Sequence, residues 1–137
     1  VAAGAGLLTP QLAMATWPKA AFGAKNVDAA TSDLLGSSDL NASKDVTIKA
    51  PAIAENGAVV NVAVTTKLAN VDNITILVEK NAAPLAASFN LPAGTEPFIK
   101  TRVKVAKTSS IIAVVRSGGK LYSAGREVKV TIGGCGG

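Results

Sequence analysis

The stretch that decides the fold is SIIAVVRSGGKLYS, residues 110–123. Every position of 111–115 is apolar, so both faces of a strand formed there must be covered. This pattern is typical of the central strand of a sheet, although burial against a second subunit would also produce it. SGGK at 117–120 is a hairpin turn signal, and LYS at 121–123 starts the returning strand. The segment therefore predicts a central strand followed by an antiparallel neighbour.

Outward from this hairpin, apolar and polar residues alternate along most of the chain after residue 45. Turn signals recur about every ten residues, and no helix-length segment separates the strands. The pattern predicts an all-β fold, an immunoglobulin-like antiparallel β-sandwich, in which residues 51–57 form a loop. Seven or eight short strands are expected: residues 46–50, 60–65, 74–79, 85–91, 99–105, 110–116 and 127–132, with 121–123 as the start of the return after the hairpin.

A helical region is expected before the strands, in PKAAFGAKNVDAATSDLLG at residues 18–36. A break near residues 23–26 divides it into two short helices, and Gly36 is the expected stop. The apolar residues of this region should cover one side of a sheet; they are Phe22, Val27, Leu34 and Leu35.

The amino end, residues 1–15, has the composition of the tail of an export signal. It is small and apolar, and Ala-Met-Ala at 13–15 has the small-x-small form of a signal-peptidase site. It is too short and too rich in glycine for a membrane span. We therefore expect a periplasmic protein, with a residual signal at 1–15, a helical region plus β-sandwich at 16–132 and an arm at 133–137. The alternative is that 1–15 form a helical or flexible N-terminal arm.

The chain is basic, with a net charge of +5. Its basic residues alternate with apolar ones, and no aromatic stacking platform accompanies them, so we expect no nucleic-acid partner. Lys100, Arg102 and Lys104 share one face of an expected strand. A solvated sheet face explains such a row, and a surface for an anionic partner is the alternative.

The sequence contains no His and a single Cys, Cys135. Without His, the chain can hold neither a Ser-His-Asp triad nor a Cys–His dyad of its own. One Cys and no His also exclude a structural zinc site. We therefore expect no catalytic residue, no metal ligand and no resident cofactor, and we predict a non-enzyme that serves as a substrate or carrier.

The single thiol lies in GGCGG at residues 133–137, with two glycines on either side. Runs of glycine are costly to order, so this segment is expected to form a flexible arm that reaches about 17 Å when extended. Cys135 would be accessible to a deep pocket of another protein, and no Lys, Arg or His beside it would activate it. Such a thiol is suited to be operated on by other enzymes.

Three alternatives remain open for the tail. It is an engineered conjugation tag, or it links a structural β-sandwich interaction module to a partner through a disulfide, or it belongs to a ubiquitin-like sulfur carrier charged at the carboxylate of Gly137. The ubiquitin-like carriers are β-grasp folds, in which a helix lies between strands of the sequence. Here the helical region precedes all the expected strands.

KVTIGGCGG at residues 129–137 closely resembles the C-terminal motif of the SoxY family, the sulfur-carrying subunits of SoxYZ complexes in periplasmic thiosulfate oxidation. PAIAENGAVV at 51–60, LVEKNAAPLAASFNL at 77–91 and TRVKVAKTSSIIAVV at 101–115 also resemble that family. The resemblance covers about residues 17–137. The leader resembles the end of a twin-arginine signal, but the twin arginines are not in the sequence.

The resemblance implies an immunoglobulin-like sandwich that forms a heterodimer with a SoxZ subunit. It implies that Cys135 covalently holds the sulfur intermediates, with Gly133, Gly134, Gly136 and Gly137 as a swinging arm. A c-type cytochrome would load thiosulfate, a hydrolase would release sulfate, and in some organisms a sulfur dehydrogenase would oxidise the remaining sulfur. The exposed thiol also predicts a homo-oligomer linked through Cys135 by a disulfide.

Overall fold

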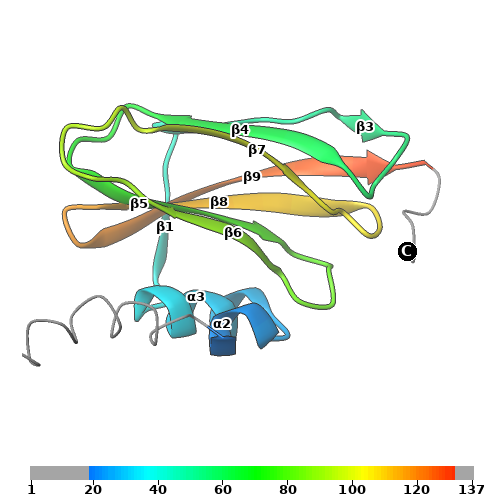
Figure 1. Ribbon diagram of the computed structural model, residues 1–137, viewed down its shortest axis with the longest axis horizontal. Coiled ribbons are helices and arrows are strands. Elements are labelled where there is room, and N and C mark those ends of the chain that lie inside the picture. The colour runs from blue at the N-terminus through cyan, green and yellow to red at the C-terminus, as the bar shows by residue number, and fades with distance from the viewer. Residues whose placement is uncertain (1–18, 132–137) are drawn as a thin grey trace, which may run out of the picture.

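Residues 19–131 of the chain are described by a computed structural model, in which two helices and two sheets form three layers (Figure 1). The helices are α2 (Lys19–Gly23) and α3 (Val27–Leu35). The strands are β1 (Leu40–Ala42), β2 (Val46–Lys49), β3 (Ile53–Ala54), β4 (Val60–Thr66), β5 (Val71–Val78), β6 (Leu85–Asn90), β7 (Phe98–Val103), β8 (Ser109–Ser117) and β9 (Lys120–Val130).

The larger sheet has six strands. Its order is β1-β9-β8-β5-β6, and β3 pairs with β9 beyond β1. The expected hairpin joins β8 to β9, with Ser117 opposite Lys120. Gly118 and Gly119 form its turn with φ values of 57° and 81°, a left-handed conformation that glycine adopts at low cost and that matches the twist of a two-residue hairpin.

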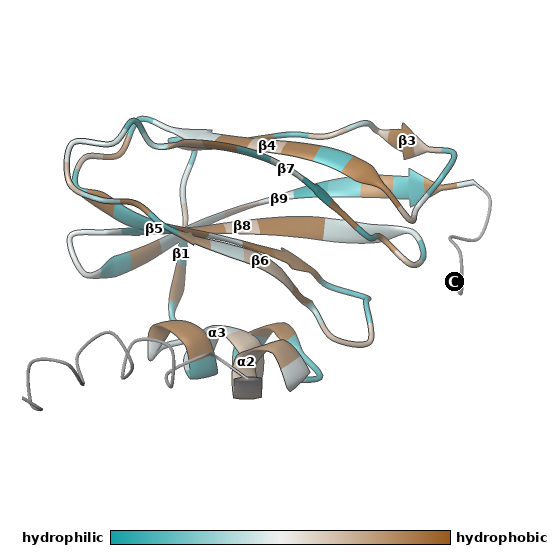
Figure 2. Ribbon diagram, in the orientation of Figure 1, coloured by the Kyte–Doolittle hydropathy of each residue, from teal (hydrophilic) through white to brown (hydrophobic). Residues whose placement is uncertain are grey.

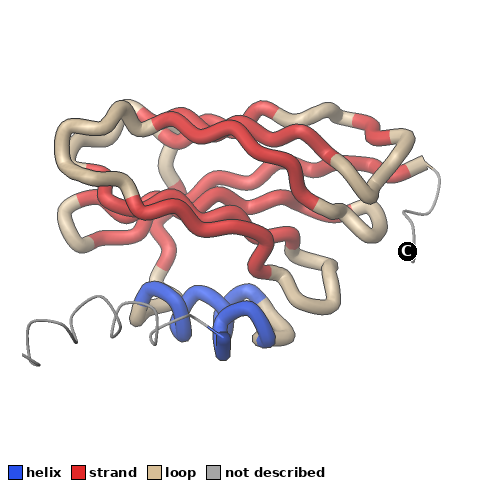
Figure 3. Tube along the Cα trace, viewed as in Figure 1, coloured by secondary structure: helices blue, strands red, loops and turns tan. Residues whose placement is uncertain are grey.

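The central strand β8 is covered on both faces, as its uninterrupted apolar run predicts. Ile111, Ala113 and Val115 belong to the core between the two sheets. Val114 and Ile112 face the other way and pack in a second cluster with the helices. The second cover is therefore the protein's own helical layer (Figure 3).

The main core is made of small aliphatic side chains from both sheets. Val60, Val62 and Val64 of β4 face Ile74 and Ile76 of β5, and all five are almost fully buried. In Figure 2, β4 is brown along most of its length, with one teal segment. The expected immunoglobulin-like β-sandwich is confirmed.

The helical layer also follows the sequence prediction. Asn26 ends the break between the helices, where its Oδ1 accepts a hydrogen bond from the Ala29 N–H at 2.8 Å and caps α3. Gly36, with φ of 80°, ends α3. The four apolar residues expected to cover a sheet do so, against the second cluster of buried residues.

Two short strands were not predicted, and both pair parallel with β9. One is β1, and the other is β3, which lies inside the stretch 51–57 that was expected to be a loop. Strands of two or three residues contain too few positions to show a period of two. The formation of β1 and β3 therefore depends on pairing with the edge of β9, and their own sequence pattern does not predict it.

A polar cluster lies on β5 and β6. Asn73 is 2% exposed and Thr75 is fully buried. The Asn73 Nδ2 donates to Ser88 Oγ at 3.1 Å and to Asn90 Oδ1 at 3.0 Å, and Thr75 Oγ1 donates to Asn73 Oδ1 at 2.6 Å. Buried polar groups cost stability unless they are paired, so these contacts fix the pairing of β5 with β6.

We predict that Asn73→Ala lowers the free energy of unfolding by about 1–3 kcal/mol, because it removes three hydrogen bonds, one of them to the buried Thr75. Urea denaturation measures the change. Asn90→Ala is the control: Asn90 is exposed and makes one of these bonds, so its loss should stay within about 0.5 kcal/mol. Equal losses for the two variants would contradict the role given to Asn73.

Candidate functional site

The residues predicted to carry the chemistry, Gly133, Gly134, Cys135, Gly136 and Gly137, lie outside the described residues. The export signal expected at 1–15 also lies outside them. The structure does describe the end of β9, from which the predicted arm continues. This end and the segments that hold it are the candidate functional site.

The last described residues of β9 are held from both sides. Antiparallel pairing with β8 stops where Ser109 lies opposite Val128. Beyond that point the Lys129 N–H donates to the Ala52 carbonyl at 2.9 Å, and the Thr131 N–H donates to the Ala54 carbonyl at 3.2 Å.

The opposite edge is held by a side chain, because the Val130 N–H donates to Thr108 Oγ1 at 2.9 Å. Successive amides of a strand point to opposite edges, and here each of the three finds a partner. The base of the predicted arm is thus fixed up to residue 131.

Gly57 brings the loop after β3 against this end of β9. Its carbonyl accepts from the Val105 N–H at 2.7 Å. A Cβ built at Gly57 would lie 2.2 Å from the Val105 carbonyl oxygen and 3.1 Å from Cγ1 of Val130. The first distance is an impossible contact with backbone, so only glycine allows this approach.

A second brace comes from the turn between β5 and β6. Asn81 donates through Nδ2 to the Lys104 carbonyl at 2.7 Å and accepts through Oδ1 from the Ala106 N–H at 3.0 Å. The Lys80 N–H donates to Oγ of Ser109, a buried residue, at 3.0 Å. These bonds fix the loop that carries Thr108, and through it the end of β9.

Within residues 19–131 no group of three or more His, Cys, Asp or Glu side chains is placed to hold a metal ion. What the arrangement provides is mechanical: a rigid origin for the segment that follows.

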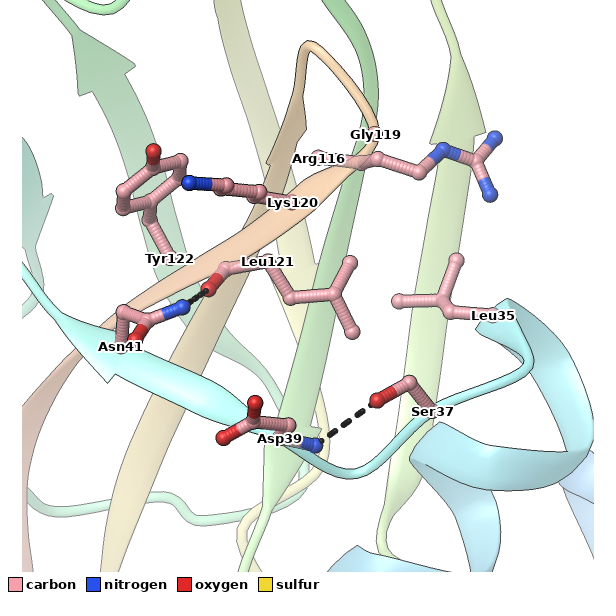
Figure 4. A pocket seen from close by; sticks show the side chains of 9 residues that line it. All are labelled: Leu35, Ser37, Asp39, Asn41, Arg116, Gly119, Lys120, Leu121 and Tyr122. Atoms are coloured by element: carbon pink, nitrogen blue, oxygen red, sulfur yellow. Dashed lines mark hydrogen bonds between the residues drawn. The ribbon is translucent and has the colours of Figure 1, made fainter.

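A pocket of about 440 Å³ lies at the other end of β9, between the β8–β9 turn and the segment after α3 (Figure 4). Two of its polar side chains have structural partners: Asn41 Nδ2 donates to the Leu121 carbonyl at 3.0 Å, and Arg116 Nε donates to Asp72 at 2.7 Å. Ten residue steps along β9 separate Lys120 from Val130, about 33 Å. This pocket is therefore remote from the base of the arm.

Sequence reasoning missed β3, Gly57, Asn81 and Thr108 as parts of this site. Pro51 and the pair Asn56-Gly57 are ordinary turn signals, and they suggested a loop with no particular role. Gly57 is needed for a close approach and not for a left-handed φ, and only the position of Val105 reveals that need.

We predict that Gly57→Ala lowers the free energy of unfolding by about 2 kcal/mol or more, because the new methyl group must displace backbone. Thermal or urea unfolding measures this change. Gly125→Ala is the matched control in β9: its Cβ would meet only the Ile111 carbonyl oxygen, at 3.8 Å, an ordinary contact. Full stability of the Gly57 variant would show that this approach is not needed.

Comparison with known proteins adds a family and a fold. The family model of "Sulfur oxidation protein SoxY" matches residues 31–135. Among solved structures, the sulfur carrier protein SoxY from Chlorobium limicola f thiosulfatophilum is 43% identical with a TM-score of 0.71, and the match covers 82% of this chain and 97% of that chain. A search of curated proteins found no match.

A more distant solved structure shares the fold alone. It is the superoxide reductase (neelaredoxin) from Ignicoccus hospitalis, which is 20% identical with a TM-score of 0.54. That match covers 62% of this chain and 78% of the reductase.

Proposed function

The chain belongs to the SoxY family of sulfur oxidation proteins, and from this premise we propose that it is a periplasmic carrier that holds thiosulfate-derived sulfur covalently on Cys135. The observation that carries the proposal is the position of the chain's single thiol. Cys135 lies five residues after Val130, the last residue of β9. The N–H groups of residues 129–131 are all hydrogen bonded. The family match also reaches residue 135.

In the proposed loading step, the Cys135 sulfur forms a bond with the terminal sulfur of thiosulfate. The thiol loses its proton, and the two electrons released pass to a c-type cytochrome. The product is a cysteine S-thiosulfonate. In the next step a hydrolase adds water to the terminal sulfone, the sulfur–sulfur bond to it breaks, and sulfate and two protons leave a persulfide anion on Cys135. A sulfur dehydrogenase, where present, oxidises that remaining sulfur.

The carrier needs no catalytic group of its own in this scheme. With no His in the chain, the proton and electron transfers fall to the partner enzymes. The proposed role of Gly133, Gly134, Gly136 and Gly137 is to let the thiol enter narrow active sites, since glycine has no side chain to obstruct a tunnel. A SoxZ subunit completes the proposed heterodimer, in keeping with the SoxYZ complexes to which this family contributes.

The alternatives for the tail differ in what they require. A ubiquitin-like carrier would need a β-grasp fold, and the chain is a β-sandwich. A disulfide-linking interaction module remains distinguishable by what is bound to Cys135. Within residues 19–131, no helix is long and apolar enough to cross a membrane. A periplasmic location belongs to the proposal and is supported by the composition of residues 1–15.

Protein purified without reductant from thiosulfate-grown cells should carry sulfur or thiosulfonate adducts on the peptide that contains Cys135, and reductant should remove them. Intact mass followed by peptide mapping measures this. Cys135→Ser should carry none and should not be loaded. A bare thiol, or a cross-linked protein alone, would favour the interaction module. Sulfur on the Gly137 carboxylate would overturn the assignment to Cys135.

Replacing Gly134 and Gly136 with Val should leave the fold intact and should slow loading about tenfold to a hundredfold, since a reacting group misplaced by about 1 Å can lose about a hundredfold in rate. The reason is that the branched side chains would obstruct entry of the arm into the enzymes. Loading rates in a reconstituted system measure the effect, with unfolding of the same variant as the check on its stability. Turnover equal to wild type would refute the swinging-arm model.

A further inference from the structure

The smaller sheet presents a basic surface to solvent, here called the outer face. Val60, Val62 and Val64 face the core, so their alternate neighbours face outward. No residue of β2, β4 or β7 is acidic. The outer face consists of Thr47, Lys49, Asn61, Ala63, Thr65, Phe98, Lys100 and Arg102.

Strand register brings the cations of the outer face together. Lys49 and Lys100 both lie opposite Ala63, one on each side. Two strand spacings separate their backbones by about 10 Å. Arg102 lies opposite Asn61, one step along the same face. The three cations thus form one group with a small side chain in its centre.

The surface is hollowed and partly apolar. A hollow of about 400 Å³ lies over Ala63 between Lys49, Lys100 and Phe98. An adjoining hollow of about 820 Å³ is lined by Val59, Asn61 and Arg102, among others. Of the three large hydrophobic residues that are exposed within residues 19–131, two border these hollows, Val59 at 52% and Phe98 at 46%.

The cations of the outer face keep their charge available for a partner. Within the described part of the chain, the one ion pair joins Arg116 to Asp72, on the other sheet. Lys49, Lys100 and Arg102 are exposed, and none of them takes part in it. The acidic surface of a partner could therefore pair with these three cations without breaking any ion pair seen in the described part of the chain.

One end of this surface, at Val59 and Arg102, lies near the base of the arm, whereas Thr65 and Phe98 lie at its other end. Val59 follows Gly57 by two residues, and Arg102 precedes Val105 by three. Gly57 and Val105 are hydrogen bonded at 2.7 Å, and Gly57 lies against Val130 at the end of β9. In Figure 1 the end of β9 lies beside β3 at the right of the molecule.

We infer that the outer face is the surface on which the enzymes that act on Cys135 dock, through an acidic surface of their own; this inference rests on the proposed function. Permanent interfaces are larger and more apolar than this face. A basic face with two apolar anchors suits repeated, salt-sensitive encounters. Docking there would place the partner's active site within reach of the nearby arm.

The test reverses the charge of Lys100 and Arg102 (K100E/R102E) and measures thiosulfate loading by the c-type cytochrome of the same organism. The matched control is K25E/K120E, with the same change in net charge. Lys25 is exposed between α2 and α3, and Lys120 is exposed at the β8–β9 turn. Both lie away from the outer face.

The K100E/R102E variant should raise the KM for the carrier about tenfold or more at low ionic strength. It should leave kcat at saturation unchanged, and it should weaken the dependence of kcat/KM on salt. The control variant should behave like wild type. Wild-type kinetics for K100E/R102E, or an equal effect in the control, would overturn the inference.

Cys135→Ser in the same assay separates this inference from the proposed function. If that variant is still loaded, the proposed function fails, whatever the outer face does. If it is not loaded and K100E/R102E behaves like wild type, the docking inference alone fails. Loss of heterodimer formation with the SoxZ subunit in K100E/R102E would make the outer face a permanent interface and overturn enzyme docking.

Binding to anionic membranes is tested separately with phosphatidylglycerol vesicles. Vesicle binding by wild type but not by K100E/R102E, with unchanged loading kinetics, would assign the outer face to a lipid surface. Absence of vesicle binding together with the raised KM supports a protein partner.

Discussion

The burial of β8 on both faces is the constraint on which the rest of the structure depends. A strand with apolar side chains in both directions is stable only between two covers. The smaller sheet covers Ile111 and Val115, and the helices cover Val114. Both covers come from the same chain, so the sandwich does not need a second subunit to close its core. Surfaces that folding does not consume, such as the outer face, remain available for partners.

Much of this architecture could be predicted because its signals are long. β4 and β8 are seven and nine residues long, and β8 contains the continuous apolar run 111–115. α3 begins after the capping Asn26 and ends at Gly36. What escaped prediction depends on partners distant in sequence. The β3 strand exists because the edge of β9 needs acceptors, and Thr75 is buried because Asn73 and Ser88 satisfy it.

The candidate site likewise has one part that the sequence predicts and another that it does not. The lone thiol and its glycines could be identified from the sequence, because composition alone distinguishes them. The segments that hold the base of the arm could not, because Thr108 and Gly57 are ordinary residues until their contacts with Val130 are known. The basic row at Lys100, Arg102 and Lys104 was recognised with two interpretations, and β7 ends at Val103, so Lys104 lies beyond the strand. Register added Lys49 to the same face, and exposure added Val59 and Phe98.

The pairing at the end of β9 also determines how the molecule bears tension. If an enzyme grips the tail and the two proteins drift apart, the pull runs along the axis of β9. Its hydrogen bonds to β8 and β3 lie across that axis, so they are loaded in shear and share the force. A tail attached to an unpaired loop would instead strip its contacts one at a time. A force applied along β9 is thus resisted by several hydrogen bonds at once, and the strand stays paired in its sheet.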